Sequence, residues 1–133
     1  MRRRVILMVV AMFALLAVVG GVALAATIDG TNGNDRLIGT KKADQINGKG
    51  GQDLIRGRLG ADTLNGGAGD DTIYAGPRDE TAMDDVSAGK GDDWIRVLNR
   101  PAAKDIVDCG SGFDKVIVDN KDVVSGCNRV IRP

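Results

Sequence analysis

The sequence repeats itself every nine residues from Gly30 onward. Five consecutive units read GTNGNDRLI, GTKKADQIN, GKGGQDLIR, GRLGADTLN and GGAGDDTIY. Glycine is first in every unit, aspartate is sixth and an aliphatic residue is eighth. In order, these residues are Gly30, Gly39, Gly48, Gly57 and Gly66, then Asp35, Asp44, Asp53, Asp62 and Asp71, then Leu37, Ile46, Ile55, Leu64 and Ile73. Low complexity alone cannot explain recurrence at three fixed positions, so it indicates an internal repeat.

The same phase survives two interruptions, which indicates that the repeat is structural. After Tyr74 the insertion AGPR delays the next unit by four residues, and a three-residue excess occurs around VLNRPAAK. The sixth and eighth positions resume as Asp84 and Val86, Asp93 and Ile95, Asp105 and Val107, and Asp114 and Val116. Beyond these units Asp122 and Val124 come one residue too early, so we expect the register to fail there.

The N-terminal segment does not belong to the repeat and has the features of a secretory signal. Three arginines lead it, an apolar run follows over residues 5–19, and the segment ends in Ala-Leu-Ala, the small-x-small form that signal peptidase requires. We therefore predict a signal peptide over residues 1–25, cleaved after Ala25, and a mature domain over residues 26–133. An uncleaved membrane anchor is the alternative, because residues 5–26 are just long enough to span a bilayer.

The charged residues of the predicted mature domain are unusual in kind. The chain has 18 Lys and Arg and 18 Asp and Glu, so removal of the three signal arginines leaves a net charge of about −3, which argues against nucleic acid as a partner. Glu80 is the one glutamate among these acids, which indicates that a short carboxylate close to the backbone is required. The chain has no histidine, which excludes the usual catalytic bases and most zinc sites.

The units resemble the repeat-in-toxin (RTX, hemolysin-type) calcium-binding nonapeptides, whose pattern is G-G-x-G-x-D-x-hydrophobic-x. The resemblance implies an all-β fold, a right-handed parallel β-roll (β-solenoid) of nine-residue repeats, here preceded by a signal-peptide helix. It also implies two units per turn and calcium ions between stacked loops. Glycines let carbonyl oxygens point at a cation, and Ca²⁺ takes six to eight oxygen ligands without needing His or Cys. The aliphatic eighth residues are then expected to point inward and form a narrow core.

Two units per turn place loops that are eighteen residues apart on the same edge of the roll. The first edge collects the loops GTNGN, GKGGQ, GGAGD, AGKGD and CGSGF, all with glycine fourth. The second edge collects GTKKA, GRLGA, AGPRDETAM and VLNRPAAK, and here Lys42 replaces the fourth glycine and brings a positive charge. We therefore expect calcium mainly at the first edge.

The resemblance carries over to specific calcium ligands. First-edge sites are expected between Asp35 and Asp53, Asp53 and Asp71, Asp71 and Asp93, and Asp93 and Asp114. The glycines expected to shape the loops are Gly30, Gly33, Gly48, Gly50, Gly66, Gly69, Gly89 and Gly91. A weaker second-edge site is expected between Asp44 and Asp62, and none at Asp84 or Asp105. The alternative for all these aspartates is turn capping, in which Asp hydrogen-bonds its own backbone.

The two cysteines, Cys109 and Cys127, are eighteen residues apart, which is one turn of such a coil. Vertically adjacent residues would then be roughly 4.8 Å apart, within the Cα range of a disulfide. We predict that this bond staples the C-terminal coil, about residues 105–133, and two free thiols are the alternative.

The outward residues give little specific information about function. Tyr74 and Trp94 are expected to point outward, as incidental surface residues or as a platform for a partner. The arginines expected as solvated outer charges, or as marks of an acidic glycan or surface partner, are Arg36, Arg56, Arg58, Arg78, Arg96 and Arg100.

The sequence as a whole predicts a secreted, extracellular calcium-binding protein that is not an enzyme and whose cofactor and expected partner is Ca²⁺. No nucleic acid partner and no stable membrane association after signal cleavage are expected. An extracellular interaction or adhesion protein built on the same roll is the alternative. A small hydrolase using Asp pairs is a remote one, because aromatic residues to line a sugar site are scarce.

Overall fold

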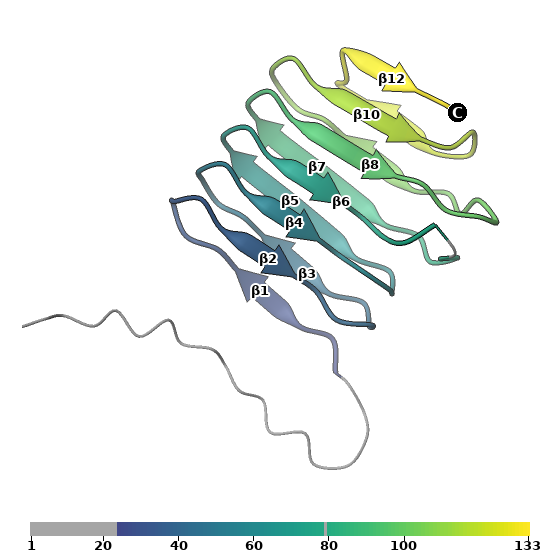
Figure 1. Ribbon diagram of the computed structural model, residues 1–133, viewed down its shortest axis with the longest axis horizontal. Helices are drawn as coiled ribbons and strands as arrows, with labels where there is room; N and C mark the ends of the chain where they lie inside the picture. Colours follow the sequence, from purple (N-terminus) through teal and green to yellow (C-terminus); the bar gives the residue numbers. More distant parts are fainter. Residues whose placement is uncertain (1–23, 79) are drawn as a thin grey trace, which may run out of the picture.

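The computed structural model describes residues 24–78 and 80–133, which form twelve short β-strands (Figure 1). The strands are β1 (Thr27–Asp29), β2 (Arg36–Ile38), β3 (Gln45–Asn47), β4 (Leu54–Arg56), β5 (Thr63–Ala68), β6 (Thr72–Tyr74), β7 (Asp85–Lys90), β8 (Trp94–Val97), β9 (Ile106–Asp108), β10 (Lys115–Val118), β11 (Val123–Ser125) and β12 (Arg129–Ile131). These two ranges contain no helix with the length and hydrophobicity needed to cross a membrane. The predicted signal peptide and its helix lie almost entirely outside the described residues.

The strands alternate between two parallel sheets. The odd sheet has the order β1-β3-β5-β7-β9-β11 and the even sheet the order β2-β4-β6-β8-β10-β12. Paired residues in the first turns are eighteen positions apart, as at Ile28 and Ile46 or Leu37 and Ile55. Each turn therefore adds one strand to each sheet, which gives a parallel β-solenoid of about six turns (Figure 1). This confirms the predicted all-β fold with two units per turn.

The core is a single stack of aliphatic side chains between the two sheets. In most strands the middle residue is buried and its two neighbours face outward, because successive side chains of a strand point to opposite faces. The buried eighth residues are Leu37, Ile46, Ile55, Leu64, Ile73, Val86, Ile95, Val107 and Val116. Burying each such side chain contributes roughly 1.5–3 kcal/mol, so every turn is held mainly by the turns next to it.

The register is kept after both interruptions, as predicted. Val86 pairs with Leu64, and Val107 pairs with Val86. The predicted slip of one residue after Asp114 is confirmed, because Val124 pairs with Val107 and not with the residue eighteen positions before it. Strand pairing nevertheless continues, since β11 and β12 both join their sheets. The turn that leads to β11 is one residue shorter than the regular turns, and this shortening absorbs the slip.

The predicted disulfide is confirmed in the last turns of the roll. Cys109 and Cys127 are bonded, with a Cα–Cα distance of 5.1 Å. Cys109 is fully buried and also donates its backbone N–H to the carbonyl of Ser125. The bond joins two successive first-edge loops, as the eighteen-residue spacing indicated.

Candidate metal centre

The sixth-position aspartates of the first edge form a ladder of hydrogen bonds along the roll. In each rung the backbone N–H of one residue donates to Oδ1 of the aspartate one turn further on. The rungs run from Asp35 to Asp53 (2.8 Å), Asp53 to Asp71 (2.9 Å), Asp71 to Asp93 (2.8 Å), Asp93 to Asp114 (3.0 Å) and Asp114 to Asn128 (2.8 Å). Asparagine serves on the last rung, so the ladder bond itself does not require a charge.

The second edge carries the same kind of ladder. Its rungs run from Ala26 to Asp44 (2.7 Å), Asp44 to Asp62 (2.8 Å), Asp62 to Asp84 (2.9 Å), Asp84 to Asp105 (2.7 Å) and Asp105 to Asp122 (3.1 Å). The sequence did not predict these contacts. Turn capping was the nearest interpretation, but each aspartate here bonds the backbone of the preceding turn. At the N-terminal end Asp35 and Asp44 also accept N–H groups from their own loops, from Thr31 and Thr40, and at the C-terminal end Oδ2 of Asp122 accepts the N–H of Asp119.

The second carboxylate oxygen of the central aspartates is buried and has no hydrogen-bond partner. These oxygens are Oδ2 of Asp53, Asp62, Asp71, Asp84, Asp93, Asp105 and Asp114. An unpaired buried polar atom is costly, and an ionised one more so, unless a charge compensates it. Each interior turn therefore offers one free carboxylate oxygen at each edge.

Burial raises the pKa of most of these carboxyls, because removal from water disfavours the charged form. The pKa of Asp62, Asp71 and Asp93 rises to about 6 and that of Asp84 to about 8, although a backbone N–H bond to each carboxylate opposes the shift. Neighbouring carboxylates add to the increase, including Asp93 beside Asp71 and Glu80 beside Asp84. The ladders are therefore columns of closely spaced, buried carboxyl groups.

Glycine allows main-chain oxygens to approach the first-edge loops. Gly69 and Gly91, both fourth in their units, have φ angles of 120° and 129°. A Cβ on Gly69 would lie 2.0 Å from the carbonyl oxygen of Gly51, and one on Gly91 would lie 2.2 Å from that of Gly69. The carbonyls of fourth residues therefore point along the stack onto the next loop, an approach that only glycine permits.

The first glycine of a unit lies beside the unpaired carboxylate oxygen. A Cβ on Gly66 would lie 2.4 Å from Asp71 Oδ2 and 2.4 Å from the carbonyl oxygen of Ala88 in the next turn. A carboxylate oxygen from one turn and a carbonyl oxygen from the next therefore both lie beside the Cα atom of Gly66. Ca²⁺ prefers such a set of oxygens, so the first-edge residues fit this ion.

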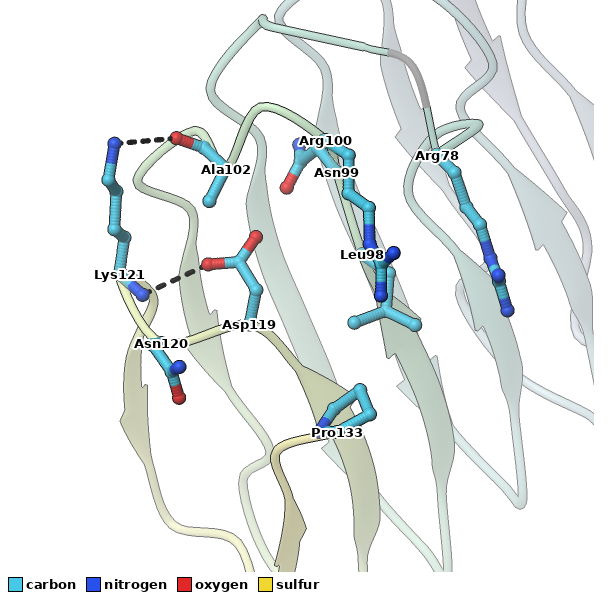
Figure 2. Close-up of a pocket in the computed structure, with 9 residues that line it drawn as sticks. All are labelled: Arg78, Leu98, Asn99, Arg100, Ala102, Asp119, Asn120, Lys121 and Pro133. Atoms are coloured by element: carbon cyan, nitrogen blue, oxygen red, sulfur yellow. Dashed lines mark hydrogen bonds between the residues drawn. The ribbon is translucent and has the colours of Figure 1, made fainter.

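The second edge is built differently around its ladder. Glu80 is buried, and its Oε1 accepts the N–H of Gly60 at 2.6 Å. A cavity of about 480 Å³ lies between its inserted segments (Figure 2), with this lining: Arg78, Leu98, Asn99, Arg100, Ala102, Asp119, Asn120, Lys121 and Pro133. In this cavity Lys121 donates its Nζ to the carbonyl of Ala102 and its backbone N–H to Asp119 Oδ1. The first glycines are arranged as at the first edge, because a Cβ on Gly57 would lie 2.3 Å from Asp62 Oδ2 and 2.4 Å from the carbonyl oxygen of Ala75. Among the described residues, what recurs only along the first edge is the stacking of fourth-position glycines on one another's carbonyls.

The structure places the predicted ligands as follows. Asp53, Asp71, Asp93 and Asp114 lie in one column with the first-edge glycines, and Asp44 and Asp62 lie in the other column. Asp35 is at the N-terminal end, where both its carboxylate contacts are to Thr31. Gly33 does not have a positive φ, unlike the fourth glycines after it. No three carboxylate or thiol side chains of the described residues converge as a metal-binding group, so main-chain oxygens must supply much of any coordination.

Sequence reasoning missed four residues of the ladders. Asp84 and Asp105 make the same ladder bonds as the first-edge aspartates, which was not expected. Asp122 and Asn128 were not predicted to belong to either ladder. Asp122 could have been found, because it precedes Val124 by two residues as every sixth residue precedes its eighth.

Comparison with protein families and known proteins bears on the same residues. The model of the RTX calcium-binding nonapeptide repeat, four copies long, matches residues 29–64 and, overlapping them, residues 47–77. No match was found among curated proteins or among solved structures. The matched segment contains the first two rungs of the first-edge ladder, the rung from Asp44 to Asp62 of the second-edge ladder, and the regular nine-residue units. Residues 29–77 of this chain are RTX calcium-binding nonapeptide repeats.

Proposed function

We propose that the chain is a secreted calcium-binding protein whose folding is driven by calcium held between the stacked loops of the first edge. The observation that carries the proposal is the column of buried, unpaired Oδ2 atoms at Asp53, Asp71, Asp93 and Asp114. These carboxylates and the carbonyls of the first-edge loops are the groups that would hold the ion. Bound calcium supplies the positive charge that neighbouring carboxylates lack.

Folding and metal binding are coupled in this proposal for two physical reasons. Without a cation, the roll must bury carboxylates whose charges repel one another along each edge, and the raised pKa of Asp71 and Asp93 reflects that cost. Glycine-rich loops also lose more conformational entropy on ordering than other segments. The free energy of ion binding offsets both terms and so becomes folding free energy.

An extracellular location supports the same function. The disulfide between Cys109 and Cys127 is of a kind that persists in oxidising compartments, and the N-terminal segment has the sequence features of a signal peptide. Extracellular calcium modules work at roughly 0.1–1 mM calcium, so the chain would fold after export. The proposed role is one of metal-dependent structure and involves no catalysis.

The test is circular dichroism of the chain from residue 26, in chelator and in millimolar calcium. We expect little β-structure in chelator and a cooperative gain of it on calcium addition. Magnesium should substitute poorly, because it requires tighter octahedral geometry than these flexible loops offer. The same spectrum in chelator and in calcium would refute the proposal.

A further inference from the structure

The two sheets of the roll present outer faces of opposite character. Outward residues of the even sheet include five cations and no acid: Arg36, Arg56, Arg96, Lys115 and Arg129. The odd sheet instead carries Asp29, Asp85 and Asp108, with Lys90 as the cation of its strands. Because the predicted mature domain is acidic overall, this gathering of cations on the front sheet of Figure 1 is a local feature.

The only tyrosine and the only tryptophan of the chain meet on this basic face. The rings of Tyr74 and Trp94 have centroids 5.2 Å apart and an interplanar angle of 61°. The guanidinium carbon of Arg56 lies 5.3 Å from the centroid of Tyr74. Tyr74 is also paired in register with Arg56 on one side and with Arg96 on the other. The face therefore holds an aromatic surface with a cation on each side of it.

A cavity of about 470 Å³ opens beside Tyr74, where the even sheet meets the second edge. Its lining includes four cations, which are Lys41, Arg56, Arg58 and Arg96, together with Tyr74 and Leu59. Among residues 24–78 and 80–133, no acidic residue lines it. The volume falls in the range of small-ligand pockets, and arginine guanidinium groups bind carboxylates through paired, charge-assisted hydrogen bonds.

We propose that this face binds a linear acidic polysaccharide, with carboxylates of its sugar units at Arg56 and Arg96 and a sugar ring against Tyr74. The cations lie on five of the six strands, in two neighbouring rows of outward positions: Arg56 and Arg96 flank Tyr74 in one row, and Arg36, Lys115 and Arg129 lie in the other. A ligand with repeated, spaced carboxylates matches cations spread in this way. Nucleic acid fits less well, because its dense phosphate charge would meet the acidic remainder of the domain.

The proposal does not depend on the calcium sites, since the face is separate from both aspartate ladders. Binding is measured in saturating calcium by fluorescence of Trp94, the one tryptophan, with two uronate probes: a hyaluronan octasaccharide and a tetragalacturonate. Chitotetraose serves as the neutral control, and a single-stranded DNA oligonucleotide as the other polyanion. We expect saturable binding of at least one uronate, weakened by salt, and none of chitotetraose.

Three variants locate the site. Arg56→Gln should weaken uronate binding about tenfold, the loss of one charge-assisted hydrogen bond. Tyr74→Ala should also weaken it, although no charge changes, which separates a sugar site from general attraction. Arg78→Gln removes an equal charge from the second-edge cavity of Figure 2 and should leave binding unchanged. Circular dichroism in calcium must show that all three variants are folded; if Arg56→Gln is not, Arg96→Gln takes its place.

Several results would overturn the proposal. These are absence of binding to both uronates, DNA binding as tight as uronate binding, or equal effects of Arg56→Gln and Arg78→Gln. Failure of calcium-dependent folding would refute the proposed function and leave this inference standing, because the glycan titration is a separate measurement.

Discussion

Replacing Asp71 by asparagine would separate the two roles of its carboxylate. Asp71 is 1% exposed, its Oδ1 accepts the N–H of Asp53, and its Oδ2 has no partner. Asparagine can keep the ladder bond, as Asn128 does for Asp114 at 2.8 Å. The substitution therefore removes the buried charge and preserves the hydrogen bond.

The magnitude follows from the raised pKa of Asp71. A shift from 3.8 to about 6 corresponds to roughly 3 kcal/mol against the ionised form at neutral pH. Water entering the metal-free loops reduces this penalty, so we expect Asp71→Asn to stabilise the roll in chelator by about 1–2 kcal/mol. In calcium the sign should reverse, because the variant loses a charged ligand between Asp53 and Asp93, and the calcium midpoint should rise severalfold.

Calcium titration of folding at neutral pH, followed by circular dichroism from chelator to millimolar calcium, measures both effects. The signal in chelator reports the small folded fraction of the metal-free chain, and the midpoint of the titration reports the loss of a calcium ligand. Asp84→Asn is the matched control, because its ladder bond is equivalent and its pKa is raised to about 8. It should also raise the folded fraction in chelator, and it should not raise the calcium midpoint. The reasoning fails if Asp71→Asn lowers the folded fraction in chelator. The assignment of calcium to the first edge fails if Asp84→Asn shifts the midpoint as much as Asp71→Asn.

Three further predictions concern pH, backbone and disulfide. Folded carboxyls with raised pKa values hold protons that the unfolded chain releases near 3.8, so the β-structure seen by circular dichroism in chelator should fall as pH rises from about 4 through 6 and, for Asp84, through 8. Gly91→Ala, at φ 129° and with Cβ 2.2 Å from a carbonyl oxygen, should cost more than about 2 kcal/mol in urea unfolding, whereas Gly33→Ala, whose nearest atom is at 3.6 Å, should cost under about 1 kcal/mol. Replacing Cys109 and Cys127 by serine should lower unfolding free energy by about 3 kcal/mol in calcium; an unchanged value would show that the last turns do not need the bond.

The nine-residue period was enough to predict the turns, the core and the disulfide. If two units make one turn, side-chain alternation requires Ile46 and Ile55 to point inward. The eighteen-residue spacing then places Cys109 and Cys127 next to each other in successive turns. These features depend only on the number of residues between repeated positions, which can be read directly from the sequence.

Features that depend on the direction of individual atoms could not be predicted in the same way. The spacing of Asp84 predicted its position on the second edge. It could not predict that Oδ1 of Asp84 accepts an N–H from the preceding turn. The contact of Tyr74 with Trp94 requires the longer turn after Tyr74, which puts Trp94 opposite Thr72. Glu80 lies in an insertion that has no repeat counterpart, so no pattern could indicate its bond to Gly60.

The insertion after Tyr74 also shows how the roll could be used as a display scaffold. The two extra segments lie at the second edge, yet β7 pairs residue for residue with β5 and β8 pairs in register with β6. Loop length at this edge is therefore decoupled from strand pairing. A foreign peptide placed between Gly76 and Met83 would be held at the rim of a regular stack, and its presence would leave the first edge free to bind ions.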